Sequence, residues 1–384
     1  MTATQSTLAQ NIAESLLARN RILEDFFAEK APWLAAVSQE MAERFLSGGR
    51  LLAFGRGACA TDAQHVSVEF VHPVIVGKRA LPALDLSFAF ESWLDALTQP
   101  EDIVIGFAPP EGDARVQAAL DAAQARNAMI CKLPTASDDA FINQEAIEVL
   151  YHTLWETVHV FLEHRELGQD AGAAGFLYPF LGENRHAPDS LRKEVAESIR
   201  IKVSDDARLR AQVAEEQSER IAATTCAISE RIRQGGKLIL FGNGGSATDA
   251  NDWAIDCVAP PTGWRPIPAI SLALEPANIS AIANDVGTEV VFLRQLIAHA
   301  RPQDVAIGIS TSGGSRNIIA ALEEARKRGL LTVALLGYDG GEILRRGLAD
   351  FPLIVRCDYI PRIQEVQASI YHTIRALQEG PGRA

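Results

Sequence analysis

The sequence has few of the features that mark secreted, membrane or nucleic-acid-binding proteins. Its five cysteines stand among 384 residues without any CxxC spacing, which is typical of reduced thiols. No apolar run reaches the roughly 18 residues of a membrane span, and the N-terminus lacks the basic start and apolar core of a signal peptide. The net charge of −13 argues against binding to nucleic-acid backbones. We therefore expect a cytoplasmic protein that binds neither membranes nor nucleic acids.

A repeated stretch indicates two copies of one domain. SGGRLLAFGRGACATDAQ begins at Ser47, and QGGKLILFGNGGSATDAN begins at Gln234, 187 residues later. In each copy, short apolar segments alternate with helical patterns, which predicts a parallel sheet covered on both faces. We expect two tandem α/β domains of the doubly wound, flavodoxin-like type at 1–167 and 191–384, joined by a Gly- and Pro-rich linker at 168–190. Long N-terminal helices of each copy are expected to pack between the domains.

Two loops of the second copy have the composition of an anion-binding site. GISTSGGSRN, residues 308–317, follows an apolar segment and precedes a helical pattern, so hydroxyls and helix N–H groups would face an anion. GNGGS, residues 242–246, also leaves a predicted parallel strand, and ligands of such sheets collect at the carboxyl ends of strands. Neither loop reads GxxxxGK[ST], so a nucleoside triphosphate is not indicated. Taken alone, the loop at 308–317 is also explained as an N-cap with a flexible turn, and the two loops together favour phosphate binding.

The motifs GNGGSxxDA, AxANDxG, ISTSGxSxN and RIQEx6H all occur in the second copy. With them the chain resembles the phosphoheptose isomerases of the SIS (sugar isomerase) family, closely over residues 195–380 and through the repeat over 15–165. The resemblance implies tandem SIS domains and the isomerisation of sedoheptulose 7-phosphate to an aldoheptose 7-phosphate. It also implies a site for the sugar phosphate, formed by Asn243, Gly244, Ser246, Asp285, Ser310, Thr311, Ser312, Ser315 and Gln364.

The positions that match the family's catalytic and metal-binding residues differ between the copies. In the second copy they are occupied by Asp252, Asp256, Gln364 and His372, where two aspartates replace the family's His and Glu. In the first copy the resemblance places the unchanged family residues at His65, Glu69, Gln144 and His152. The resemblance therefore implies two alternative sets of catalytic and metal-binding residues, with Glu69, His152, Asp256 and His372 as the catalytic candidates.

The first copy lacks the serine-rich loop. Ala108, Pro109, Pro110 and Asp113 stand where the second copy has Ser310, Thr311, Ser312 and Ser315. Prolines remove N–H donors, and acidic side chains repel phosphate. We expect the first copy not to hold phosphate in its own loop.

Aldose–ketose isomerisation moves a proton between C1 and C2 through an enediol, which needs a base and an acid. Glutamate and histidine fill these roles when burial and neighbours tune their pKa values. A ligand set with histidines favours zinc, which would polarise the carbonyl. Our hypothesis is one kind of working site near the interface between copies, with phosphate on the second copy's serines.

Two alternatives remain open at this point. A non-catalytic phosphosugar-binding regulator would explain the changes to Asp252 and Asp256, whereas the four residues kept by the first copy favour an enzyme. An isomerase for a pentose or hexose phosphate is the nearer alternative. From the family's tetramers we expect a homodimer of tandem chains.

Overall fold

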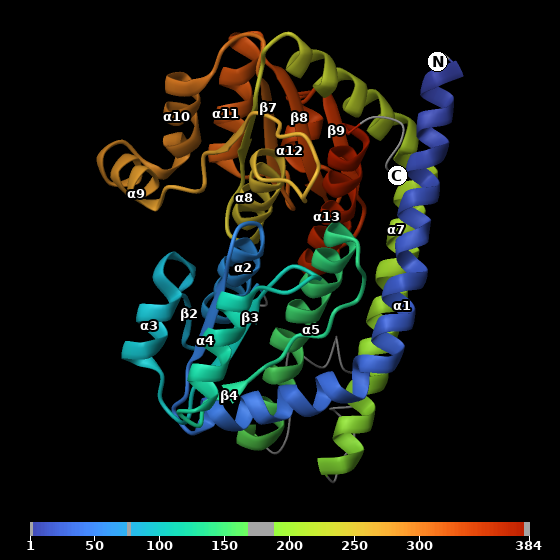
Figure 1. The fold of residues 1–384 in the computed structure, drawn as a ribbon. Helices are drawn as coiled ribbons and strands as arrows, with labels where there is room; N and C mark the ends of the chain where they lie inside the picture. Colours follow the sequence, from blue (N-terminus) through green and yellow to red (C-terminus); the bar gives the residue numbers. More distant parts are fainter. Residues whose placement is uncertain (1–2, 75–77, 168–187, 380–384) are drawn as a thin grey trace. The chain divides into compact units, whose positions relative to one another are not determined.

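The computed structural model describes residues 3–74, 78–167 and 188–379 (Figure 1). The predicted linker at 168–190 lies outside the described residues apart from its last three, which begin helix α7. None of the described helices has a stretch both long and apolar enough to cross a membrane.

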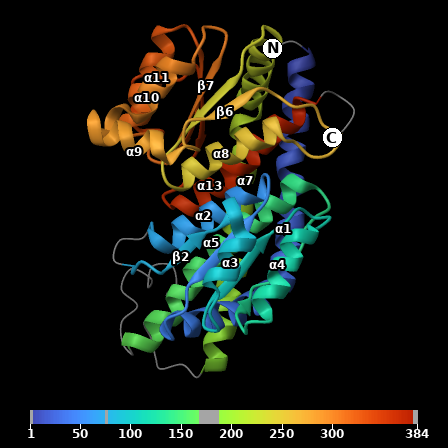
Figure 2. The same ribbon diagram turned by 60° about the vertical axis from the view of Figure 1, so that its left-hand side comes forward.

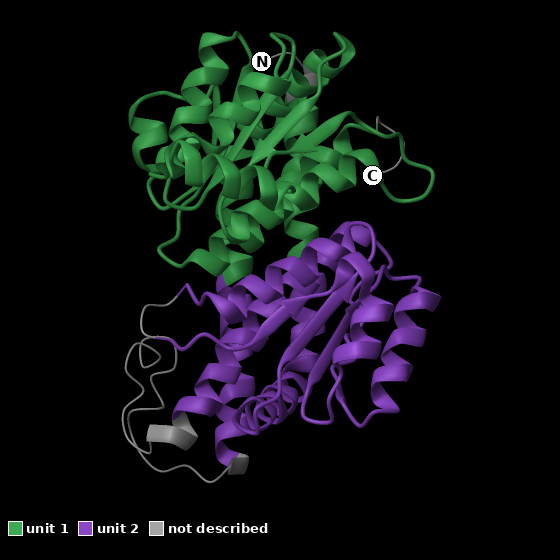
Figure 3. Ribbon diagram, turned by 90° about the vertical axis from the view of Figure 1, so that its left-hand side faces the viewer, with its two compact units in different colours: residues 1–20, 206–384 green, residues 21–205 purple. Residues whose placement is uncertain are grey.

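The chain divides into two compact units (Figure 3). The first-copy unit comprises residues 21–205, and the second-copy unit comprises residues 1–20 together with 206–384. Helices α1 (Ala3–Leu46) and α7 (Pro188–Arg233) contribute residues to both units. The compact units are therefore not identical to the two contiguous domains at 1–167 and 191–384, because residues 1–20 and 191–205 belong to the other unit. The contiguous domain boundaries stay a prediction from the sequence repeat.

The first-copy unit contains a four-stranded parallel sheet in the order β2-β1-β3-β4. Beyond parts of α1 and α7, its elements are β1 (Leu51–Gly55), α2 (Cys59–Val71), β2 (Ala83–Asp85), α3 (Phe90–Leu97), β3 (Ile103–Phe107), α4 (Ala114–Gln124), β4 (Met129–Ile130) and α5 (Ala140–Leu167), with a 3₁₀ turn at Ser87–Ala89.

The second-copy unit contains a five-stranded parallel sheet in the order β6-β5-β7-β8-β9. Its remaining elements are β5 (Leu238–Phe241), α8 (Gly245–Val258), β6 (Ala269–Ser271), α9 (Pro276–Asp285), a 3₁₀ turn at Thr288–Val290, α10 (Val291–His299), β7 (Val305–Ser310), α11 (Arg316–Lys327), β8 (Leu331–Gly337), α12 (Gly341–Arg345), β9 (Phe351–Val355) and α13 (Ile360–Leu377). Counted within the unit, the order is 2-1-3-4-5, which is the flavodoxin-like order. The doubly wound α/β prediction is confirmed.

Both sheets are apolar on both faces, as the sequence predicts. In β5, Leu238 and Leu240 join the core cluster formed with α8 and α13, whereas Ile239 and Phe241 join the cluster formed with α10 and α11. Figure 2 shows α10 and α11 on one side of this unit and α8 and α13 on the other. In β1 the same alternation separates the core shared with α2 and α5 from the core shared with α3 and α4. Because the central strands β1, β3, β5, β7 and β8 are largely buried, ligands have access at the carboxyl edge, where the loops lie.

Candidate active site

The cradle, defined here as Ser310, Thr311, Ser312 and Ser315, lies between β7 and α11, where the sequence predicts a phosphate site. Ser310 ends β7, and Ser315 is the N-cap residue of α11. The Ser310 and Ser315 hydroxyl oxygens are 3.3 Å apart, and the Gly313 N–H donates to Ser310 Oγ at 3.1 Å. Within the described chain, the Ser315 side chain caps none of the N–H groups of α11. Hydroxyls and a helix N-terminus thus converge as an anion requires.

The second loop meets the cradle where the strand order reverses. β5 and β7 are neighbours in the sheet, and the loops that follow them are joined by two amide side chains. Asn243 Nδ2 donates to Asn317 Oδ1 at 3.0 Å, and Asn317 Nδ2 donates to Asn243 Oδ1 at 2.8 Å. Gly244 is exposed with a φ of 56°, and Ser246 is buried in the first turn of α8. These residues lie at the switch point, where open α/β sheets bind ligands.

A second-copy centre, defined as Asp252, Asp256 and His372, is buried between α8 and α13. The two aspartates are one turn apart on α8 and face the same helix. His372 Nε2 lies 3.5 Å from Asp252 Oδ2 and 3.3 Å from Asp256 Oδ2. Burial, followed by repulsion from Asp252, raises the pKa of Asp256 to about 7, although His372 acts in the opposite direction. A carboxyl group with such a pKa exchanges its proton near neutral pH.

A first-copy centre, defined as His65, Glu69 and His152, is buried between α2 and α5. His65 Nε2 lies 3.8 Å from Glu69 Oε1 and 3.4 Å from His152 Nε2. One ligand atom from each residue lies within 4.8 Å of the others. His65 and Glu69 lie on the same face of α2 because they are four residues apart. The packing of α5 on α2 places His152 next to them. Two imidazoles and one carboxylate at these separations form a ligand set that suits zinc.

Comparisons with known proteins bear on both centres. The SIS domain family matches residues 204–337. A phosphoheptose isomerase of Geotalea daltonii is 39% identical over 184 residues, which are 48% of this chain and 95% of the relative. A phosphoheptose isomerase of Geobacter sp. strain M21 is 44% identical over 165 residues, 43% of this chain and 85% of that protein.

The chain belongs to the SIS domain family. A solved structure, the C-terminal domain of glucosamine-fructose-6-phosphate aminotransferase from Francisella tularensis, covers 92% of this chain and 92% of its own with a TM-score of 0.57. Its sequence identity is 9%, so this likeness concerns the fold alone. It is a likeness over nearly the whole chain, and both parallel sheets of the chain have the order expected of tandem SIS domains.

Three further residues predicted from the SIS resemblance are Gln144, Gln364 and Asp285. Gln144 is half-buried on α5, and its amide donates to Asp62 Oδ2 at 3.5 Å. Gln364 is buried on α13. Asp285 is exposed at the end of α9, where its carboxylate accepts a hydrogen bond from Asn284. In each predicted set, the histidines and carboxylates come together.

The degenerate loop of the first SIS copy is occupied by its own side chains. Asp113 is the N-cap of α4, and its Oδ1 accepts from Arg115 N at 2.8 Å and from Val116 N at 3.1 Å. Its Oδ2 accepts from Arg56 Nη1 at 2.6 Å. Burial would raise the pKa of Asp113, but these hydrogen bonds outweigh it and lower the pKa. A carboxylate therefore already occupies the helix N-terminus that corresponds to the cradle.

The sequence interpretation did not single out two tyrosines. Tyr371 Oη donates to Asp252 Oδ2 at 2.7 Å, and Tyr151 Oη lies 2.9 Å from His65 Nδ1. Each tyrosine immediately precedes the histidine that α5 or α13 supplies to the centre. It contacts the first of the two centre residues on α2 or α8, which is His65 or Asp252. The Tyr-His dipeptide occurs in both copies, so a comparison of the two C-terminal helices could have identified this pair.

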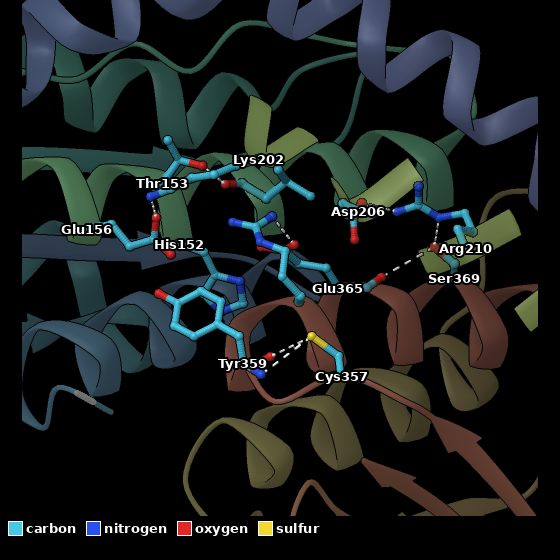
Figure 4. Close-up of polar contacts among 12 residues, drawn as sticks. His152, Thr153, Glu156, Lys202, Asp206, Arg210, Cys357, Tyr359, Glu365 and Ser369 are labelled. Carbon is cyan, nitrogen blue, oxygen red and sulfur yellow. Dashed lines mark hydrogen bonds and ion pairs between the residues drawn. The ribbon is translucent and has the colours of Figure 1, made fainter. Parts of the chain in front are cut away.

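Buried ion pairs fix the long helices beside these centres. Glu156, one turn beyond His152 on α5, binds Lys202 of α7 (Figure 4). In the second-copy unit, Arg210 binds Asp206 and donates to Ser369 Oγ of α13 at 2.9 Å. The Glu156–Lys202 pair joins α5 to α7, and the Arg210–Ser369 hydrogen bond joins α7 to α13. Leaving any of these charges buried and unpaired is costly, so these contacts hold the helices in one position.

Proposed function

We propose that the chain is a phosphosugar aldose–ketose isomerase that acts on sedoheptulose 7-phosphate. The observation that carries this proposal is helix α8, which begins in the loop beside the cradle and bears Asp252 and Asp256. At 1.5 Å per residue, Asp252 lies about 10 Å along the helix axis from Gly245. A sugar phosphate held at one end of this helix extends toward the acid/base centre at its other end. The likeness to phosphoheptose isomerases supports the same substrate class.

The second-copy centre has the groups that enediol chemistry requires. Asp256 serves as the base that removes a proton from C1 or C2, since its raised pKa leaves it partly ionised at neutral pH. His372, 3.3 Å away, protonates the oxygen of the enediol. The Tyr371 hydroxyl, which donates to Asp252, holds that carboxylate in place and stabilises its charge.

The first-copy centre is proposed as a zinc site. His65, Glu69 and His152 would hold the ion, and zinc when bound supplies a Lewis acid that polarises a carbonyl. The second-copy centre, with two carboxylates and one imidazole, offers a harder ligand set. Glu69 and His152 are also the alternative base and acid, because they match the family residues without change.

Two matched carboxylate-to-amide substitutions separate these assignments. Asp256→Asn is expected to abolish turnover of sedoheptulose 7-phosphate, whereas Glu69→Gln is expected to lower zinc content measured by inductively coupled plasma mass spectrometry. Asp95→Asn, on an exposed side chain of α3, is the control and should leave both unchanged. Loss of turnover with Glu69→Gln alone moves the chemistry to the first-copy centre. Full turnover with both variants refutes both assignments of the catalytic carboxylate, and no turnover by the unmodified protein refutes the isomerase function.

A second candidate function is supported by the same aspartates. Asp256 is one methylene shorter than the glutamate of the family, and a base displaced by one bond length loses rate severely. A phosphosugar-binding regulator needs only the cradle. Tight binding of the sugar phosphate without turnover by the unmodified protein would favour this function, and a panel of pentose, hexose and heptose phosphates tests the substrate.

We also propose a homodimer, which light scattering would report as twice the 41.5 kDa chain mass.

A further inference from the structure

Tyr338 has a backbone conformation that tyrosine rarely adopts. Its φ is 49°, and among the described residues other than glycine only Asn127 also has a positive φ. The left-handed region is unfavourable for a residue with a Cβ atom, and asparagine tolerates it better than tyrosine. Such strain persists where the surrounding structure imposes it, and it concentrates at binding sites.

The turn that contains Tyr338 lies at the same sheet edge as the cradle. It joins β8 to α12 and is closed by Gly340 N, which donates to Gly337 O at 2.9 Å. Asp339 Oδ1 accepts from Gly341 N at 3.0 Å. Since β8 pairs in parallel with β7, the residues that follow the two strands emerge beside each other.

Backbone contacts join this turn to the cradle. Gly337 N donates to Thr311 O at 2.9 Å, and Ile343 N donates to Gly313 O at 2.9 Å. The backbone at Gly340 approaches Gly313 so closely that a Cβ on Gly313 would lie 2.2 Å from the Gly340 oxygen. The turn and the cradle therefore form one rigid body, which fixes the conformation of Tyr338 relative to the serines.

The side chain of Tyr338 is half-buried against the core cluster on one face of the sheet. Burial raises the pKa of Tyr338, and the acidic groups of Asp358 and Cys357 add to the effect, so the hydroxyl keeps its proton. The segment beside it is fixed by Cys357, whose sulfur accepts from Tyr359 N at 3.4 Å (Figure 4). Among the described residues, none is hydrogen-bonded to the Tyr338 hydroxyl, so it remains available as a donor.

We propose that Tyr338 determines specificity at the phosphosugar site, where its hydroxyl donates a hydrogen bond to a hydroxyl group of the sugar while the cradle holds the phosphate. The strained turn that carries Tyr338 is hydrogen-bonded through its backbone to Thr311 and Gly313 of the cradle loop. This inference rests on the proposed function only in that a phosphosugar binds the cradle, since turnover is not needed to test it.

Calorimetric titration with two ligands tests this role in the full chain. Tyr338→Phe should weaken binding of sedoheptulose 7-phosphate about fivefold, the loss of one neutral hydrogen bond, and leave the Kd of inorganic phosphate unchanged. Tyr338→Asn should weaken sugar-phosphate binding at least as much, because it removes the whole phenol. In turnover assays, Tyr338→Phe should raise KM and retain kcat.

Three results would overturn the proposal. The first is equal affinity of the unmodified protein and Tyr338→Phe for the sugar phosphate. The second is that Tyr338→Phe weakens the binding of the sugar phosphate and of inorganic phosphate to the same extent, which would indicate a structural role. The third is that the unmodified protein binds the sugar phosphate no more tightly than inorganic phosphate, since no sugar contact then exists. Binding that follows the expected pattern without turnover supports Tyr338 and refutes only the isomerase function.

Discussion

Substitution of Gly313 by alanine should dismantle the cradle. A Cβ atom at this position would lie 2.2 Å from the carbonyl oxygen of Gly340 and 2.6 Å from its carbonyl carbon. Both are backbone atoms, so no flexible side chain can move aside. Gly313 also has a φ of 60°, which adds about 1 kcal/mol of strain for alanine. Overpacking of a rigid site costs about 1–3 kcal/mol more.

The expected total is a destabilisation of about 2–4 kcal/mol, or a fall in Tm of roughly 5–15 °C for a unit of this size. Phosphate binding should fall further, because the Gly313 N–H orders Ser310 Oγ and the Gly313 carbonyl accepts from Ile343 N. Differential scanning fluorimetry measures the first effect, and calorimetric titration with inorganic phosphate measures the second.

Gly314 provides a matched control in the same loop. A Cβ there would meet nothing closer than Ser312 Oγ at 3.8 Å, and its φ is not positive. Gly314→Ala should therefore change Tm by little and retain phosphate binding. Equal effects of the two substitutions, or an unchanged Gly313→Ala protein, would show that the contact between the loops does not form.

Three further predictions concern single charged groups. In metal-free protein, folding stability should decrease as pH rises from 3.8 to about 7 and then level off, because folded Asp256 keeps a proton that the unfolded chain releases. Thermal melts over this pH range measure the decrease, and Asp256→Asn should flatten it. Asp113→Ala should destabilise the chain by about 1–2 kcal/mol in urea unfolding, and Asp113→Ser by clearly less, because serine also caps helices; equal losses would contradict the capping role. Arg375→Met should cost about 3–5 kcal/mol, since the buried guanidinium binds Glu379 and the Asp256 carbonyl; unchanged Tm would show that these contacts are unimportant.

The parts of the site that follow local rules could be predicted from the sequence. The two loops of the second copy follow neighbouring parallel strands, so their convergence at the switch point follows from topology. Pairs four residues apart on one helix, such as His65 with Glu69, face the same side by helical geometry. Strand β9 was not predicted, because FPLIV is short and follows a helix of only five residues, Gly341–Arg345.

The roles that depend on tertiary packing could not be predicted in this way. The partner of Gln144 is Asp62, and a sequence motif gives no information on which buried polar group an amide will face. The raised pKa of Asp256 results from burial and from Asp252 together, and burial is known only from the fold. The division of α1 and α7 between two units likewise depends on which core each apolar residue joins.

The two copies solve one structural problem in different ways. Each must join the loop after its first strand to the start of the helix after its third strand, and Asn243 and Arg56 occupy corresponding positions in the first of these loops. The second copy uses the neutral pair Asn243 and Asn317, which leaves the N-terminus of α11 uncapped by Ser315 within the described chain. The first copy uses Arg56 and Asp113, whose carboxylate takes the backbone donors that phosphate would need. The Asp113 carboxylate thus occupies the place at its helix N-terminus that a phosphate group would occupy at the N-terminus of α11. The first copy therefore keeps a folded loop without phosphate.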